Sequence, residues 1–329
     1  MRKRIISPVL STLVLILVLS LISGCSSQQA ATTTAKSTTS VTTTASVPSY
    51  PVAQPKGRFK IATTTSLYDT GLWYYLEPLF EKAANVELDI VYAGTGAAIA
   101  QGKSGNVDAV IVHDPDQEKP FVDDGYGVNK RAFAYNFFMI AGPASDPAGV
   151  KGLDPVAAFR KIAEGAKQNA QIKFVSRGDG SGTHGAEKRL WADAGYVYTD
   201  IQKAGAWYKE AGQGMGPTLT MANEMNAYVL CDGSTFTSYK GKLALISLVE
   251  KPSASTLNVY DAYAISTAKV KTANITVANQ FINWLISADV QKVIGQYGVK
   301  EFGGPLFFPI ADPFYPAINN LTDNMKPIQ

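Results

Sequence analysis

Short apolar segments alternate with segments of helical periodicity along most of this chain. The apolar run Phe59–Ala62 is followed by polar Thr63–Ser66 and then by apolar residues at helical spacing in Leu72–Lys82. The next elements expected are strand Val86–Tyr92, helix Ala97–Gly102 and strand Val107–Val112. They are followed in order by strand Phe133–Gly142, helix Val156–Lys167, strand Ile172–Ser176, helix Gly182–Ala194, strands Leu243–Val249 and Val259–Ile265, and helices Asn274–Ile286 and Asp289–Tyr297. This β-α-β-α order predicts an α/β architecture with mostly parallel sheets, and an irregular Pro-rich end over Phe302–Gln329.

The first 25 residues have the pattern of an export signal. Arg2, Lys3 and Arg4 precede the apolar run Ile5–Leu21, which is too interrupted to predict a membrane-spanning helix. The sequence Leu21-Ile22-Ser23-Gly24-Cys25 resembles the bacterial lipobox, in which the cysteine is lipidated after cleavage. We therefore expect Cys25 to anchor an extracytoplasmic protein to the cell membrane, with an uncleaved anchor or a plain secretory signal as alternatives.

Residues 26–56 are expected to be a flexible tether. They contain 14 Ser or Thr among 31 residues, followed by Pro48, Pro51 and Pro55. Such a segment has too few large apolar side chains to offset the entropy lost on ordering.

The excess of basic over acidic residues in the chain comes from the signal and the tether. The chain has 30 Lys and Arg against 27 Asp and Glu, but Arg2, Lys3, Arg4, Lys36 and Lys56 precede Gly57 and no acid does. Residues 57–329 therefore carry a formal charge of −2. Because phosphate neutralisation supplies most of the affinity of nucleic-acid binders, this charge argues against a nucleic-acid partner.

Three loops that follow predicted strands and open predicted helices are rich in hydroxyls and glycine. They are Thr63–Ser66, Gly94–Gly96 and Ser176–His184, and the last also carries Arg177. Helix N-termini present unpaired N–H groups, glycines let a ligand approach the backbone, and hydroxyls add donors. Any one of these residues could be an ordinary helix N-cap, but three such loops together predict an oxyanion site.

Several strings resemble one family, the tungstate-binding proteins of bacterial Tup-type ABC transporters. The most specific are Ala62–Ser66 and Ser176–His184, and they are accompanied in order by Ala93–Gly96, Val112–Pro115, Gly125–Asn129, Tyr135-Asn136 and Val299–Pro309. Two positions depart from the family pattern. Gly180 stands where a second Asp is more frequent, and Asp232-Gly233-Ser234-Thr235 replaces Asp-Arg-Gly-Thr, which puts a contribution of that stretch in doubt.

The resemblance implies a two-lobed, type II periplasmic-binding-protein fold with the ligand in the cleft between lobes. Lobe I would comprise residues 57–141 and 241–329, and lobe II residues 142–240, after signal residues 1–25 and tether residues 26–56. Tungstate would be held by Thr64, Thr65, Ser66 and Thr95 from one lobe and by Arg177, Ser181 and Thr183 from the other. The expected partners are an ABC transporter permease and the membrane, and a monomer without cofactor is expected.

Other oxyanions remain open as alternatives. Phosphate-binding proteins carry a similar Arg-x-Asp-x-Ser-Gly-Thr string, and a protonated phosphate would want a carboxylate acceptor such as Asp179. Asp179 could instead orient Arg177 or cap the following helix. Molybdate has nearly the size and charge of tungstate, so the residues do not separate the two ions.

An exported hydrolase using Ser181 and His184 is the alternative from a different class. Ser181 lacks the Gly-x-Ser-x-Gly frame, and His113 and His184, the only histidines, lack a Cys or carboxylate cluster at metal-ligand spacing. We therefore expect a binding protein that is not an enzyme and has no metal site. Cys231 is expected to be a small buried residue.

Overall fold

A computed structural model describes residues 57–329. The predicted signal, the tether and the lipidation site Cys25 lie outside the described residues. Among residues 57–329, no helix has both the length and the apolar character needed to cross a membrane.

The first half of the described chain alternates strands and helices much as predicted. Its elements are β1 (Arg58–Thr64), α1 (Thr65–Asp69), α2 (Leu72–Ala84), β2 (Glu87–Ala93), α3 (Thr95–Lys103), β3 (Ala109–Val112), α4 (Pro115–Asp123), β4 (Gly127–Gly142), α5 (Pro155–Ala166), β5 (Phe174–Ser176) and α6 (Gly182–Asp193). Buried apolar residues recur along one face of α2 and of α5, which is why these segments fold as amphipathic helices.

The second half contains several elements that the periodicity did not predict. Its elements are α7 (Tyr198–Gln202), β6 (Tyr208–Glu210), α8 (Met215–Met225), β7 (Tyr228–Asp232), α9 (Gly233–Ser238), β8 (Ile246–Val249), β9 (Leu257–Ile265), α10 (Ile275–Leu285), α11 (Ala288–Gln296), α12 (Val299–Phe302), β10 (Phe308–Pro309) and the 3₁₀ helix η1 (Pro316–Met325). The expectation of an irregular C-terminus was wrong in part, since β10 pairs with β4 and Ile318 of η1 is fully buried.

The prediction of mostly parallel sheets was wrong, because the sheet is mixed. The strand order is β2-β1-β3-β9-β4-β7-β5-β6, with β8 and β10 also paired with β4. The pairs β1–β2, β1–β3, β5–β6 and β5–β7 are parallel, whereas every strand that pairs with β4 or β9 does so antiparallel. β4 and β9 are long strands in the middle of the sheet, and they run antiparallel to the strands that they pair with.

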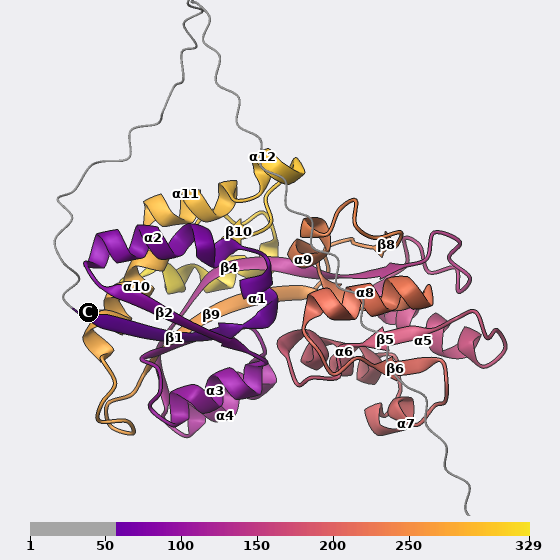
Figure 1. The fold of residues 1–329 in the computed structure, drawn as a ribbon, viewed down its shortest axis with the longest axis horizontal. Coiled ribbons are helices and arrows are strands. Elements are labelled where there is room, and N and C mark those ends of the chain that lie inside the picture. Colours follow the sequence, from indigo (N-terminus) through magenta and orange to yellow (C-terminus); the bar gives the residue numbers. More distant parts are fainter. Residues whose placement is uncertain (1–56) are drawn as a thin grey trace, which may run out of the picture. The chain divides into compact units, whose positions relative to one another are not determined.

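β4 joins two lobes, each with its own core. Its residues up to Phe137 pair with β9, whereas Phe138–Ala141 pair with β7. The buried apolar clusters divide in the same way: those on one side draw on Phe59–Ala134 and Tyr260–Phe307, and those on the other on Phe138–Val249. Figure 1 shows β4 running from one group of elements to the other. The fold is therefore the expected α/β, two-lobed one.

Candidate functional site

The three hydroxyl-rich loops each open a helix, as predicted. Thr64 ends β1 and caps α1, since its Oγ1 accepts from Leu67 N at 3.4 Å. Thr95 is the first residue of α3. Ser181 caps α6, since its Oγ accepts from His184 N at 3.2 Å, and Thr183 lies in the first turn of that helix. The ordinary capping role therefore holds for Thr64 and Ser181, whereas no capping bond uses the side chains of Thr95 and Thr183.

Contacts between the lobes bring these loops together. Arg177 NH2 donates to Thr65 Oγ1 at 2.9 Å. A Cβ built on Gly94 would lie 3.2 Å from Asp179 O, and one built on Gly182 would lie 2.6 Å from His113 Cε1. Glycines at these two points thus let the α3 and α6 N-termini approach the opposite lobe.

Six of the seven predicted ligand residues are removed from solvent. Thr64, Ser66, Thr95 and Ser181 are 0% exposed and Arg177 and Thr183 are 1% exposed, while Thr65 is half-buried. The structure therefore places these residues inside the contact between the lobes rather than on an open surface.

Several of these buried side chains have polar atoms without a partner. Among residues 57–329, the buried side-chain nitrogen and oxygen atoms that make no hydrogen bond are Thr95 Oγ1, Thr183 Oγ1, Arg177 Nε, Arg177 NH1 and Asp261 Oδ1. Four of these five atoms belong to predicted ligand residues, and all four can donate. Because leaving a buried donor unpaired costs about 1–3 kcal/mol, their grouping points to a ligand that accepts hydrogen bonds.

Asp179 holds the guanidinium of Arg177 in place. Arg177 NH2 donates to Asp179 Oδ2, and Asp179 Oδ1 accepts from Ser181 N at 3.1 Å. Asp179 therefore orients Arg177 and holds Ser181, whereas the cap of α6 is Ser181 itself. The Nε and NH1 groups of the guanidinium have no partner and remain available to donate.

Ser66 differs from Thr95 and Thr183 because it already has partners. Its Oγ lies 3.3 Å from Thr64 Oγ1 and 3.0 Å from His113 Nε2. His113 is buried, and its Nδ1 lies 2.8 Å from Asn258 Oδ1. The sequence analysis did not include this histidine in the site.

Behind His113 lies a buried polar network that joins the strands shared by the lobes. Asn258 Nδ2 donates to Asn136 Oδ1 at 2.8 Å and to Asp232 Oδ2 at 3.0 Å, and Tyr260 OH also donates to Asp232. Asp232 further accepts from Asn136 Nδ2 at 3.0 Å. The polar residues Asn136, Asp232 and Asn258, within or at the end of apolar runs of β4, β7 and β9, were the available signal for this network.

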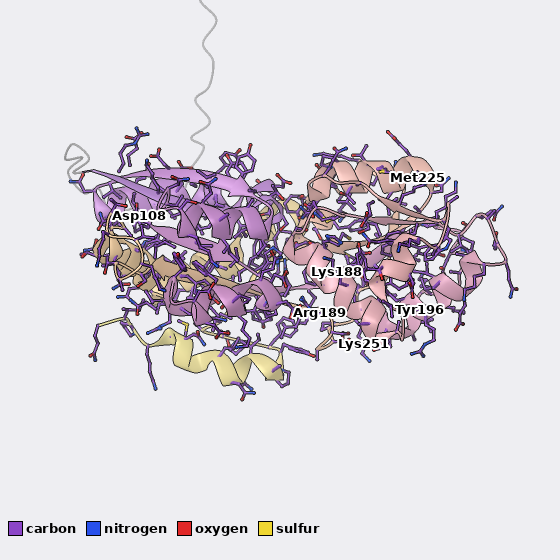
Figure 2. The ribbon with its side chains drawn as sticks, turned by 90° about the horizontal axis from the view of Figure 1, so that it is seen from below. Asp108, Lys188, Arg189, Tyr196, Met225 and Lys251 are labelled. Atoms are coloured by element: carbon purple, nitrogen blue, oxygen red, sulfur yellow. The ribbon has the colours of Figure 1, made fainter. Side chains whose placement is uncertain are left out.

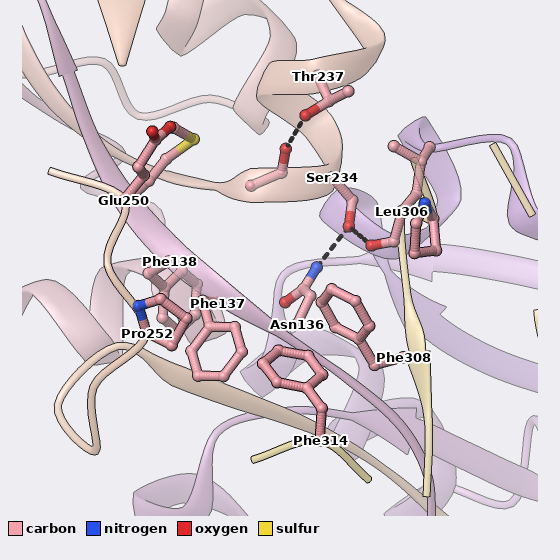
Figure 3. Close-up of a pocket in the computed structure, with 13 residues that line it drawn as sticks. Asn136, Phe137, Phe138, Ser234, Thr237, Glu250, Pro252, Leu306, Phe308 and Phe314 are labelled. Carbon is pink, nitrogen blue, oxygen red and sulfur yellow. Dashed lines mark hydrogen bonds between the residues drawn. The ribbon is translucent and has the colours of Figure 1, made fainter. Parts of the chain in front are cut away.

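The stretch that departs from the family pattern lies beside the site. Asp232 caps α9 by accepting from Ser234 N and Thr235 N, and Thr235 Oγ1 lies 3.5 Å from Ser66 O. Ser234 turns away from the three loops. Figure 3 shows its hydroxyl between Asn136 and Leu306 in a pocket with Phe137, Phe308 and Phe314. This pocket of about 220 Å³ also contains Glu250, which makes it unsuited to an anion.

The geometry does not support a catalytic pair of Ser181 and His184. His184 Nδ1 accepts from Gly180 N at 2.9 Å, and His184 Nε2 lies 2.6 Å from Tyr198 OH. Burial lowers the pKa of His184 to about 4. Neither ring nitrogen is free to take a proton from Ser181. Within residues 57–329 no group of three or more His, Cys, Asp or Glu is arranged to hold a metal ion.

Ion pairs hold the lobes together at the rim of the site. Arg189 NH1 lies 2.9 Å from Asp114 Oδ1 and 2.6 Å from Asp116 Oδ2, and Gln117 Nε2 donates to Gly180 O at 2.9 Å. Figure 2 places Arg189 where the two lobes meet. The structure is therefore a closed one.

Comparison with known proteins identifies the family. The model of the PBP superfamily domain matches residues 27–289. The chain is 40% identical over 261 residues to the tungstate-binding protein TupA of Peptoclostridium acidaminophilum, which covers 78% of this chain and 87% of that protein. The structure of the tungstate-binding protein TupA from Desulfovibrio alaskensis G20 matches with a TM-score of 0.65 and 38% identity, over 77% of this chain and 98% of that one.

A second solved structure, described as the tungstate ABC transporter from Geobacter sulfurreducens, gives a TM-score of 0.65 and 40% identity over 73% of this chain and 98% of that one. These proteins bind solutes for transport and are not enzymes. The present chain therefore belongs to the PBP superfamily and, within it, to the TupA family of tungstate-binding proteins.

Proposed function

We propose that this protein captures tungstate outside the cytoplasm and delivers it to the permease of an ABC transporter. The observation that carries the proposal is the group of four unpaired buried donor atoms on Thr95, Thr183 and Arg177. Members of this family with a tungstate-binding name share 35–40% of their residues with this chain. Thr64, Thr65, Ser66 and Ser181 complete the proposed ligand set.

The chemistry of these atoms suits a fully deprotonated oxyanion. Tungstate near neutral pH has oxygens that only accept, so hydroxyls, helix N-termini and one arginine edge match it without any acceptor. The protein recognises the oxygens of the ion, so these residues are hydrogen-bond donors and not metal ligands. Charge and donors are supplied locally, since residues 57–329 have a formal charge of −2.

Phosphate is the weaker candidate because the carboxylate among the site residues, Asp179, is not free to accept its proton. The two oxygens of Asp179 are engaged by Arg177 and by Ser181 N. A protonated phosphate would have to displace one of these bonds. Molybdate offers the same acceptors as tungstate and remains the second candidate.

The domain division is proposed as lobe I, residues 57–141 and 241–329, and lobe II, residues 142–240. The separate apolar cores on either side of β4 support two lobes, and the second core extends beyond these bounds to Phe138, Ile140, Leu248 and Val249. A ligand that contacts both lobes favours the closed state, and a permease can recognise that shape. We further propose that the protein is a monomer tethered by residues 26–56 and anchored through lipidated Cys25.

Titration calorimetry with tungstate, molybdate, sulfate and phosphate tests the proposal. We expect tight binding of tungstate and weak or no binding of sulfate and phosphate. Tight phosphate binding without tungstate binding would overturn the assignment, and equal affinities for tungstate and molybdate would make the protein a general carrier of both ions.

Replacing Gly182 with Ala should weaken tungstate binding by about 1–3 kcal/mol, the usual effect of overpacking. The added Cβ would lie 2.6 Å from His113 Cε1, so the ring or the start of α6 must move for the lobes to close. Gly304→Ala is the matched control, since a Cβ there meets no atom within 4 Å. Calorimetry measures both variants, and equal affinities would show that the contact does not limit closure.

A further inference from the structure

The hydrogen-bond network determines which protons the ligand site can offer. Asn258 Nδ2 donates to Asp232 Oδ2 at 3.0 Å, and a carboxylate accepts, so the nitrogen side of this amide must face Asp232. Its oxygen therefore faces His113 Nδ1, at 2.8 Å. Because an amide oxygen cannot donate, His113 Nδ1 must carry a hydrogen.

In a neutral His113 this leaves Nε2 without a hydrogen. Nε2 lies 3.0 Å from Ser66 Oγ, so Ser66 must donate its only hydroxyl hydrogen to the ring. Ser66 then presents only lone pairs to the site. Thr64 Oγ1 lies 3.3 Å from Ser66 Oγ, so the Thr64 hydroxyl then donates to Ser66 and not to a ligand. Beside a neutral His113, Ser66 is therefore an acceptor and repels an oxyanion.

The charges around the site also point to His113 as the group that changes its protonation. Arg177 already pairs with Asp179, so the local cation is neutralised before a dianion arrives. Asp232, which lies close to His113, adds a further negative charge to the surroundings. A buried dianion thus lacks a compensating positive charge among these residues.

We propose that binding of the dianion takes up one proton on His113 Nε2, which turns Ser66 from an acceptor into a donor toward the ligand. The protonated ring would donate to Ser66 Oγ and free the hydroxyl hydrogens of Ser66 and Thr64. His113 is thus a positioning residue that acts through Ser66. The inference rests on the proposed function, since it needs a dianion at Ser66.

The surroundings of His113 decide the direction of the pH dependence. The charged or titratable groups that face it or share its groove are Asp232, Asp114, Arg177, Tyr260, Lys130, Arg189, Asp193 and Asp261. Lys130 pairs with Asp261, and Arg189 pairs with Asp114.

Burial, helped by Arg177, lowers the pKa of His113, whereas Asp232 and Asp114 act in the opposite direction. His113 is therefore neutral near pH 7 without ligand. A dianion raises the pKa of His113 above its ligand-free value. The affinity for the dianion should then fall as pH rises from the ligand-free to the ligand-bound pKa of His113, by up to about tenfold per pH unit.

Calorimetry in buffers of different ionisation enthalpy counts the protons taken up by the full chain. At pH 7 we expect about one proton per tungstate bound, and tungstate itself holds none. In His113→Gln the uptake should disappear and the affinity should become flat between about pH 6 and 8. His184→Gln is the matched control, since its ring bonds with Gly180 and Tyr198 instead of the site, and it should keep the uptake.

NMR of the wild-type chain provides a readout that does not depend on a variant folding. The protein has two histidines, and their neutral tautomers are opposite, with the hydrogen on Nδ1 in His113 and on Nε2 in His184. Saturating tungstate should protonate Nε2 of His113 and leave His184 unchanged. Tungstate binding without proton uptake, or uptake that persists in His113→Gln, would overturn this inference alone. Failure to bind any oxyanion would instead overturn the proposed function, and this inference with it.

Discussion

Arg177→Ala is expected to weaken tungstate binding by about 2–5 kcal/mol, the range for removing one member of a buried charged pair. Arg177 is 1% exposed and its Nε and NH1 are unpaired, so it offers a ligand two donors and a positive charge that it shares with Asp179. Its removal also leaves Asp179 without its cation. Calorimetry of the variant against the wild-type chain measures the loss.

Two further variants separate the contributions of Arg177. Arg177→Lys retains a charge but not the planar edge, so it should recover only part of the affinity. Arg160→Ala is the matched control, because this exposed arginine bonds to Ala194 O on the far side of α6 and should bind tungstate as the wild type does. A loss below tenfold in Arg177→Ala would show that the anion binds elsewhere.

Asp232→Ala is expected to lower the free energy of unfolding by at least about 3 kcal/mol, since each buried donor left unpaired costs about 1–3 kcal/mol. Asp232 is 0% exposed and accepts from Asn136, Asn258, Tyr260 and two backbone N–H groups of α9. Tyr260 and the two backbone N–H groups lose this acceptor, and Asn136 and Asn258 each lose one of theirs. Urea unfolding followed by circular dichroism measures the change.

Asp154→Ala serves as the control because Asp154 is also a helix N-cap. It accepts from two backbone N–H groups of α5 but is exposed, so its replacement should cost about 0.5–2 kcal/mol. Equal losses in the two variants would mean that Asp232 acts only as a cap. In that case the buried network would contribute little to joining the lobes.

Local patterns in the sequence predicted the three loops because each is contained within one strand, one turn and one helix. Thr64, Thr95 and Ser181 could be placed at helix N-termini from the residues around them alone. Thr63 and Thr64 were expected in the turn but are the last residues of β1, since their backbone pairs with β2. The short helix α1, which begins at Thr65, was not predicted, whereas the helix expected at Leu72–Lys82 is present as α2.

The network behind Ser66 could not be predicted in this way, because its members are far apart in the chain. Asn136 and Asn258 are separated by 122 residues, and His113 and Asn258 by 145. The antiparallel pairing of β9 with β4 brings Asn136 to Asn258, and the antiparallel pairing of β9 with β3 brings His113 there. Because mostly parallel sheets were expected, the contact of His113 with Asn258 was not foreseen, and His113 was left out of the predicted site.

The small elements of the second half were missed for a different reason. β6 and α7 have three and five residues, too few to show a period, and α8 begins with Gly and Pro close together. Their positions are decided by packing against longer elements, such as that of Tyr208 against Phe174. Tertiary contacts outweigh local propensity in such short segments.

Co-crystallisation with tungstate and measurement of the anomalous scattering of tungsten test the central claim most directly. We expect one tungsten peak between the lobes, with its oxygens within hydrogen-bond distance of an unpaired N–H group of Arg177, of Thr95 Oγ1 and of Thr183 Oγ1, the buried donors that lack partners. A peak at any other place, or a peak there with Arg177 turned away from the ion, would contradict that claim.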